Sequence, residues 1–112
     1  MKIAFTSKGT DWDSLIDPRF GRTEYILFYD ETKDEFSHLD NKEIAQEAHG
    51  AGPITAEKLF RYNPDVLITG NGPGQNAAVV LDKINIKIYI GAGQMTVKEA
   101  YEAYKNNDLK TV

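Results

Sequence analysis

The sequence of 112 residues contains no cysteine. This absence excludes disulfide bonds, thiolate nucleophiles and the binding of a metal through sulfur atoms of this chain. No stretch approaches the roughly 18 apolar residues of a membrane span, and the first nine residues, MKIAFTSKG, contain too few apolar residues for a signal peptide. We therefore expect a cytoplasmic protein that does not bind membranes.

Basic runs are also absent, because the lysines and arginines are scattered and the formal net charge is −4. Neutralisation of phosphate groups supplies most of the affinity for nucleic acid, so nucleic acid is not an expected partner. With 41% hydrophobic and 27% charged residues the composition is that of an ordinary globular protein. The length predicts one domain over residues 1–112.

The stretch that organises the chain is residues 65–84, DVLITGNGPGQNAAVVLDKI. Strand formers at 66–69 give way to a glycine-rich turn and then to a helix pattern. Its apolar positions follow the i, i+3, i+4, i+7 spacing of a helix face: Ala77, Val80, Leu81 and Ile84. A second run of strand formers, 86–90, begins directly after this helix, which predicts a parallel, right-handed crossover.

The rest of the pattern predicts three further strands and two further helices. The strands are expected at 2–6, 24–30 and 35–40, with the last two paired as a hairpin. One helix follows Pro53 and presents Ala56, Leu59 and Phe60 inward, and the other follows a capping box at 96–99. Residues 41–48 are compatible with a loop or a helical turn. The predicted order of elements is β β β α β α β α. This order predicts an α/β fold with one mixed five-stranded sheet covered by helices.

All nine glycines lie outside the predicted elements, and seven of them occupy three short stretches: Gly50 and Gly52; Gly70, Gly72 and Gly74; Gly91 and Gly93. Ligands of such sheets bind outside the carboxyl ends of the parallel strands, where these stretches should form one rim. Exposed backbone amides and the positive ends of helix dipoles favour an anion there. The alternative is that each glycine caps a helix or turns a loop.

Two common phosphate-binding motifs are missing from the glycine-rich turn at 70–75. Gln75 stands where the third glycine of a dinucleotide fingerprint is required, and no Gly-Lys-Ser or Gly-Lys-Thr of a P-loop occurs. The predicted rim therefore does not belong to either of these nucleotide-binding classes.

The two histidines differ in position. His49 opens the rim in a loop, where its imidazole could reach a metal or a cluster iron; the alternative is a solvated loop residue or a cap. His38 lies in a predicted strand and is expected to be a packed or edge residue. Neither histidine has the partner spacing of a closed zinc site.

The long loop at 7–23 carries two arginines around a phenylalanine, Arg19, Phe20 and Arg22. Guanidinium groups match planar oxyanions, which indicates an anion contact. The structural alternative is that Phe20 plugs the end of the sheet while Arg19 pairs with Asp17. The aspartates of this loop do not match a calcium-binding loop, since Leu15 occupies the third ligand position.

Four segments, at 17–22, 49–52, 70–76 and 86–97, occur in an order that resembles the dinitrogenase iron-molybdenum cofactor-binding family, which includes NifX, NafY and the carboxy-terminal part of NifB. The resemblance covers essentially the whole chain. It implies a three-layer α/β/α fold with a ribonuclease H-like motif, and a small acidic domain that carries an iron-sulfur-type or iron-molybdenum-type cluster, or its precursor, without catalysis of its own.

Carried over by position, the resemblance implies contact residues in three of these segments, with His49 as the metal ligand. They are Arg19, Phe20, Gly21, His49, Gly50, Gly52, Asn71, Gly72, Gly74 and Asn76. The implied partners are the metal cluster and the proteins that donate or accept it, and the chain is expected to be a monomer or a weak dimer.

Two other function classes stay open at this point. A metal-dependent nuclease, suggested by fold analogy alone, needs a carboxylate on the first strand, and the run at 2–6, KIAFT, has none. A binding module for small anions or nucleotides, or a module that docks a partner protein, would use the same rim without metal.

Overall fold

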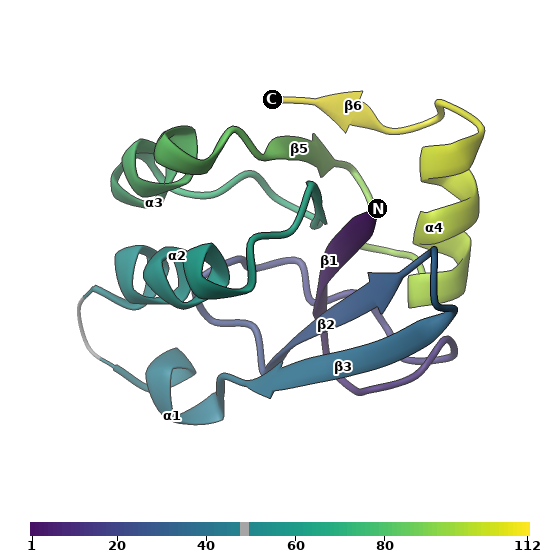
Figure 1. The fold of residues 1–112 in the computed structure, drawn as a ribbon. Helices are drawn as coiled ribbons and strands as arrows, with labels where there is room; N and C mark the ends of the chain where they lie inside the picture. Colours follow the sequence, from purple (N-terminus) through teal and green to yellow (C-terminus); the bar gives the residue numbers. More distant parts are fainter. Residues whose placement is uncertain (48–49) are drawn as a thin grey trace.

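The computed structural model describes residues 1–47 and 50–112. The described residues form a mixed α/β fold in which six strands alternate with four α-helices and one short 3₁₀-helix (Figure 1). In chain order these elements are β1 (Lys2–Ser7), β2 (Tyr25–Asp30), β3 (Glu35–Asp40), α1 (Lys42–Ala45), α2 (Ala51–Tyr62), β4 (Val66–Ile68), α3 (Gln75–Leu81), η1 (Asp82–Ile84), β5 (Lys87–Ile90), α4 (Val97–Lys105) and β6 (Lys110–Thr111).

The strands form one mixed sheet in the order β3-β2-β1-β4-β5-β6. The opening strands pair antiparallel, with Tyr25 of β2 opposite Asp40 of β3, which confirms the predicted hairpin. Strand β4 runs parallel to both β1 and β5, which confirms the predicted parallel crossover through α3.

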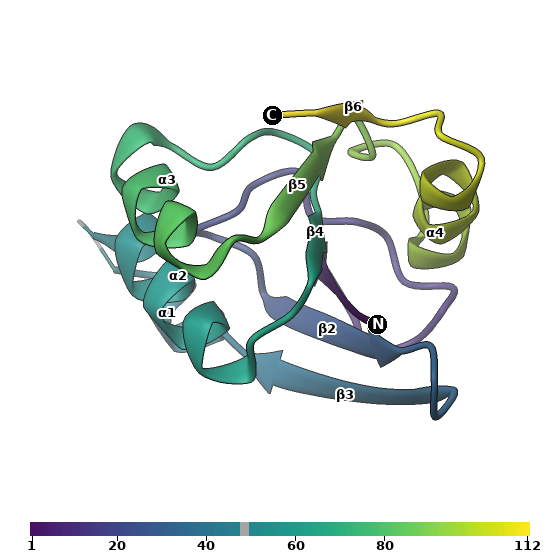
Figure 2. The ribbon, with the colours of Figure 1, turned by 45° about the horizontal axis from the view of Figure 1, so that its top comes forward.

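The expected number of five strands is wrong, because the sheet has six. The additional strand β6 has only two residues, and Thr111 pairs antiparallel with Tyr89 of β5. A strand of two residues is too short to produce a period in the sequence. It forms because the chain that leaves α4 returns along the free edge of β5 (Figure 2).

Helices α1, α2 and α3 lie on one side of the sheet and α4 lies on the other, so the molecule has three layers (Figures 1 and 2). Side chains alternate along the central strand β1: Ile3 and Phe5 pack in the core beneath α4, and Ala4 packs in the core beneath α2 and α3. All three are fully buried. The central strands are therefore apolar on both faces, as expected for strands covered on both sides.

The helices differ from expectation in three details. Phe60 does not point inward and is 49% exposed, because the buried stripe of α2 is made of Ala51, Thr55, Ala56 and Leu59. Ile84 belongs to η1, since α3 ends at Leu81. Gly52 lies inside the first turn of α2 rather than in a loop, and part of the ambiguous segment 41–48 forms the short helix α1.

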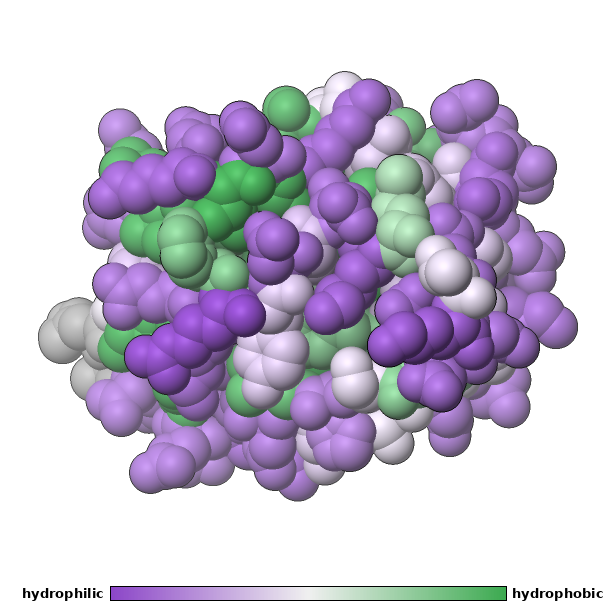
Figure 3. Space-filling view, viewed as in Figure 1, coloured by the Kyte–Doolittle hydropathy of each residue, from purple (hydrophilic) through white to green (hydrophobic). Residues whose placement is uncertain are grey.

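Hydrophobic residues reach the surface over α3 (Figure 3), at an edge of the core where Val80, Ile84 and Ile86 are only partly buried. Within residues 1–47 and 50–112, no helix has the length and apolar character that crossing a membrane requires.

Candidate anion-binding rim

Pro18, in the loop after β1, contacts the turns that follow the parallel strands β4 and β5. Its carbonyl oxygen accepts a hydrogen bond of 2.8 Å from the amide of Asn71, which follows β4. A Cβ atom placed on Gly70 would lie 2.6 Å from Pro18 Cα and 2.9 Å from Gly93 Cα, closer than real Cβ atoms come. Gly70 also accepts a 2.9 Å hydrogen bond from the amide of Gly91, which follows β5. The loop after β1 and the turns after β4 and β5 therefore meet at one point.

The same loop also contacts the start of α2. A Cβ atom placed on Gly21 would lie 2.6 Å from the backbone nitrogen of Gly52, so the two backbones touch here. A Cβ atom placed on Gly52 would lie 3.5 Å from Cβ of Ala77, in the first turn of α3. Helices α2 and α3 thus begin next to each other, beside the Arg19-Phe20-Gly21 element. The structure brings together the glycine-rich segments that the sequence assigned to one edge of the sheet.

The glycines of this rim fall into two groups. Some pack against another segment: at Gly21 and Gly70 an added Cβ would come within 3.0 Å of its backbone, and at Gly52 and Gly93 it would meet the nearest atoms at 3.5 and 3.4 Å. Others are exposed to solvent, and these are Gly50, Gly72, Gly74 and Gly91. Only the second group has the open backbone that a ligand can reach. Asn71 and Asn76, at the two ends of the turn that precedes α3 and enters it, are exposed as well.

Helices α2 and α3 both start without a side-chain cap. Their N-cap residues are Gly50, with φ of 79°, and Gly74, and among the residues that the structure describes neither start has a side-chain cap hydrogen bond. Helix α4 differs, because its Thr96 and Glu99 form the predicted capping box, with hydrogen bonds of 3.2 and 2.9 Å. First-turn amides without a side-chain cap, together with the helix dipole, favour an anion. Two such starts lie side by side at the rim.

The Asp17 carboxylate anchors Arg19. Asp17 is fully buried and accepts hydrogen bonds from the Arg19 amide at 3.1 Å and from Arg19 Nε at 3.3 Å. The Arg19 side chain is 57% exposed, so its guanidinium group lies at the surface of the rim. Phe20 is 4% exposed and packs in the core beneath α2 and α3. These contacts are those of the structural alternative for Asp17, Arg19 and Phe20, and they leave only Arg19 of the three accessible to a ligand.

Arg22 borders a small cavity beside Arg19. Its Nη1 donates hydrogen bonds of 2.7 and 2.8 Å to the carbonyl oxygens of Ala45 and Glu47 at the end of α1. The cavity has a volume of about 230 Å³, and its lining residues are Arg19, Arg22, Glu24, Lys42, Ala45 and Gln46. It therefore brings together three cationic side chains and one carboxylate.

Lys42 is a member of this cavity that the sequence analysis missed. It lies in a polar stretch with no motif, and only the return of the chain after β3 brings it beside the two arginines. Its Nζ lies 4.9 Å from the ring centroid of Tyr25. The pKa of Lys42 is raised, mainly by its interaction with Tyr25 and then by the charge of Asp40.

Of the two histidines, the structure describes only His38. His49, the expected metal ligand, lies outside the described residues. His38 is an exposed residue of the edge strand β3, and its ring contacts Tyr25 edge-on at a centroid distance of 5.8 Å, as expected for an edge residue. Within residues 1–47 and 50–112, no three His, Cys, Asp or Glu side chains are grouped so that they could hold a metal ion.

A family model described as "Dinitrogenase iron-molybdenum cofactor" matches residues 1–107. This match covers nearly the whole chain and includes every segment of the rim. The chain therefore belongs to the dinitrogenase iron-molybdenum cofactor family, as the sequence resemblance indicated. No match was found among curated proteins.

Three solved structures are similar over more than nine-tenths of their length. The apo form of the orange protein from Desulfovibrio gigas is 30% identical, with a TM-score of 0.91 over 99% of this chain and 92% of that one. TM1290 from Thermotoga, a NifB-like protein of the DUF35 family, is 32% identical, with a TM-score of 0.83 over 98% of this chain and 91% of that one. PH0822 shares the fold at 17% identity, with a TM-score of 0.73 over 100% of this chain and 96% of that one.

Proposed function

We propose that this protein is a non-catalytic carrier for an anionic iron-sulfur-type metal cluster, or for the precursor of one. The observation that carries the proposal is the convergence of the α2 and α3 starts, neither with a side-chain cap, with the exposed turn at 71–76 and the guanidinium group of Arg19. Backbone amides and guanidinium groups both donate hydrogen bonds to anions. Donors from three separate segments can then surround one side of a bulky anion.

The donor set suits a cargo that brings its own sulfide. Iron-sulfur clusters are usually held by cysteine thiolates, and this chain has no cysteine. The rim can instead contact the outer atoms of an assembled cluster, with Arg19 and the exposed amides as donors. We propose His49 as the one residue that binds a metal atom directly, because it immediately precedes Gly50 in the sequence. Few protein ligands suit a carrier that must release its cargo.

The comparisons support this reading at the level of the family. The family description refers to the iron-molybdenum cofactor of dinitrogenase, and one similar structure is an apo form. We further propose the ribonuclease H-like classification of the three-layer fold, and a role without catalysis. The described β1 strand, KIAFTS, offers no carboxylate to hold the magnesium ion of a nuclease.

The proposal is tested by loading the purified protein anaerobically with a preformed thiolate-ligated [4Fe–4S] cluster and with tetrathiomolybdate. After desalting, retained iron, molybdenum and visible absorption are measured for the wild type, Arg19→Gln and His49→Ala. We expect the wild type to retain metal and both variants to retain several-fold less. Arg61→Gln is the matched control, since Arg61 is an exposed arginine in the last turn of α2, away from the rim. Retention of neither compound by the wild type, or equal retention by all four proteins, would contradict the proposal.

A second candidate function is the binding of a small oxyanion or a nucleotide without metal. The cavity of about 230 Å³ lined by Arg19, Arg22 and Lys42 favours it, because its size suits a phosphate-like group. A ligand present at 100 times its Kd raises the free energy of unfolding by about 2.7 kcal/mol. A thermal-shift screen therefore separates the two candidates: stabilisation by phosphate or nucleotides, without retention of the clusters, supports the second.

A further inference from the structure

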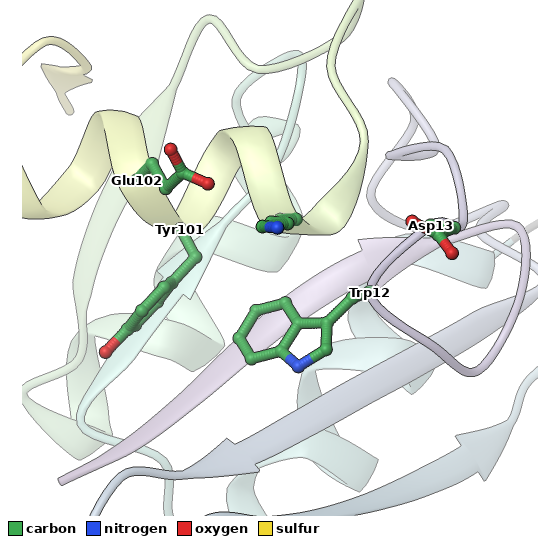
Figure 4. A pocket seen from close by; sticks show the side chains of 5 residues that line it. Trp12, Asp13, Tyr101 and Glu102 are labelled. Carbon is green, nitrogen blue, oxygen red and sulfur yellow. The ribbon is translucent and has the colours of Figure 1, made fainter.

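A second cavity lies on the opposite face of the sheet from α2 and α3, beside α4 (Figure 4). It has a volume of about 480 Å³, and its lining residues are Trp12, Asp13, Lys98, Tyr101 and Glu102. This volume lies within the range of cavities that hold small organic molecules. None of these residues belongs to the rim, so a ligand bound here would occupy a site separate from the rim.

Trp12 provides a rigid aromatic wall. Its ring contacts those of Phe36, Tyr29 and Tyr101 at centroid distances of 4.8, 4.9 and 5.3 Å. The carbonyl oxygen of Trp12 accepts a 3.0 Å hydrogen bond from the amide of Lys98, which ties its loop to α4. Trp12 is nevertheless only partly buried, as is Tyr101. The cavity therefore presents aromatic surface that is held in place before any ligand binds.

Tyr101 is held from its other end. Its hydroxyl donates a 2.5 Å hydrogen bond to Glu31, which also accepts a 2.9 Å hydrogen bond from Lys105. The hydroxyl is thus already committed outside the cavity, and its ring is the part available to a ligand. Aromatic faces attract organic cations, with tryptophan the strongest of the three aromatic side chains.

The carboxylates of the cavity supply matching charge. Asp13 and Glu102 are both exposed, and within the described part of the chain the ion pairs are Arg19 with Asp17 and Lys105 with Glu31, so neither carboxylate forms one there. In Figure 4, Asp13 and Glu102 lie on opposite sides of the cavity, with the rings of Trp12 and Tyr101 along it. The two carboxylates and the aromatic rings fit an elongated cationic ligand, although the ammonium group of Lys98 lines the same cavity.

We propose that this cavity binds an elongated organic dication, in which two ammonium or guanidinium groups are joined by a short aliphatic chain. One cationic group lies near Asp13 and the other near Glu102, and the aliphatic chain packs on Trp12. Lys98 opposes this binding, because its ammonium group shares the cavity with the ligand. Diamines and agmatine belong to this chemical class.

The fluorescence of Trp12 tests the proposal directly, since it is the only tryptophan of the chain. The full-length protein is titrated with agmatine, 1,5-diaminopentane and the monocation butylamine at low ionic strength, and isothermal titration calorimetry provides a second readout. We expect saturable binding of both dications with a Kd on the order of 1 mM. Butylamine should bind about threefold more weakly, because it can form only one of the two exposed ion pairs.

Variants of the lining residues identify the site. We expect Asp13→Asn and Glu102→Gln each to weaken agmatine binding about threefold, and Lys98→Met to strengthen it by a similar factor. Glu57→Gln and Asp108→Asn remove the same charges from exposed positions outside the cavity and should leave affinity unchanged. Absence of saturable binding would overturn the proposal, as would equal affinity for butylamine, equal effects of the lining and control variants, or binding of a dibasic peptide in place of the free dications.

Discussion

Replacement of Gly70 by alanine tests the contact that joins the segments of the rim. The φ angle of Gly70 is not positive, so alanine is compatible with its backbone. The difficulty is space: the new Cβ would lie 2.6 Å from Pro18 Cα, 2.9 Å from Gly93 Cα and 3.0 Å from Pro18 Cβ. Two of these atoms belong to the backbone and cannot move aside by changing a rotamer. Gly70→Ala must therefore separate the loop after β1 from the turns after β4 and β5.

The expected loss of stability is about 2 kcal/mol. Overpacking a well-packed site costs about 1 to 3 kcal/mol, and three close contacts place this site at the upper end of that range. Alanine also lowers the conformational entropy of the unfolded chain, which offsets about 0.4 to 1 kcal/mol of this loss of stability. With an m value of about 1.5 kcal/mol per molar urea, the midpoint of unfolding should fall by about 1.3 M.

Gly72→Ala in the same turn is the matched control for urea unfolding. A Cβ atom placed there would meet only Val112 Cγ2 at 3.8 Å and Ile90 Cγ2 at 3.9 Å, which are ordinary contacts. We expect its stability to equal that of the wild type or to exceed it by up to about 1 kcal/mol. If Gly70→Ala also unfolds within about 0.5 kcal/mol of the wild type, the close approach at Pro18 does not hold the rim together.

Three further predictions concern stability. Thr96→Ala removes the capping box of α4 and should lower the free energy of unfolding by about 1 kcal/mol in urea, and no change would show that the cap is dispensable. Asn41→Asp places a carboxylate where the fully buried amide of Asn41 donates a 3.1 Å hydrogen bond to the Thr23 carbonyl. The substitution should lower the free energy of unfolding by about 3 kcal/mol or more at pH 7, and by less at pH 4, where the acid is protonated. Equal losses of stability at both pH values would refute this. The pKa of Glu31 is lowered, first by the hydrogen bond from Lys105 and then by that from Tyr101, so its stabilising effect is present above its ordinary pKa of 4.5 and is lost as pH falls through the lower folded value. Glu31→Gln should therefore flatten the fall of Tm below about pH 4.5, and an unchanged pH profile would contradict this.

The main elements of the fold could be predicted because they rest on local patterns. The short apolar runs of β1 and β2, the glycine turn before α3 and the capping box of α4 are all signals carried by neighbouring residues. The position of the rim also follows from local information, since the carboxyl ends of parallel strands meet at one edge of a sheet. The short strand β6 and the exposure of Phe60 depend on packing partners far away in the chain, so no local pattern contains them.

The sequence by itself determined the α/β class, the parallel crossover and the set of glycine-rich segments, because each depends on periodicity or on single-residue backbone preferences. Only the tertiary structure decided which glycines are packed and which are open, as at Gly70 and Gly74. It also decided that Lys42 joins the arginines and that Trp12 lines a cavity with Glu102. The physical reason is that space and charge around a residue are set by segments distant in sequence, whose approach the sheet order and the helix packing impose.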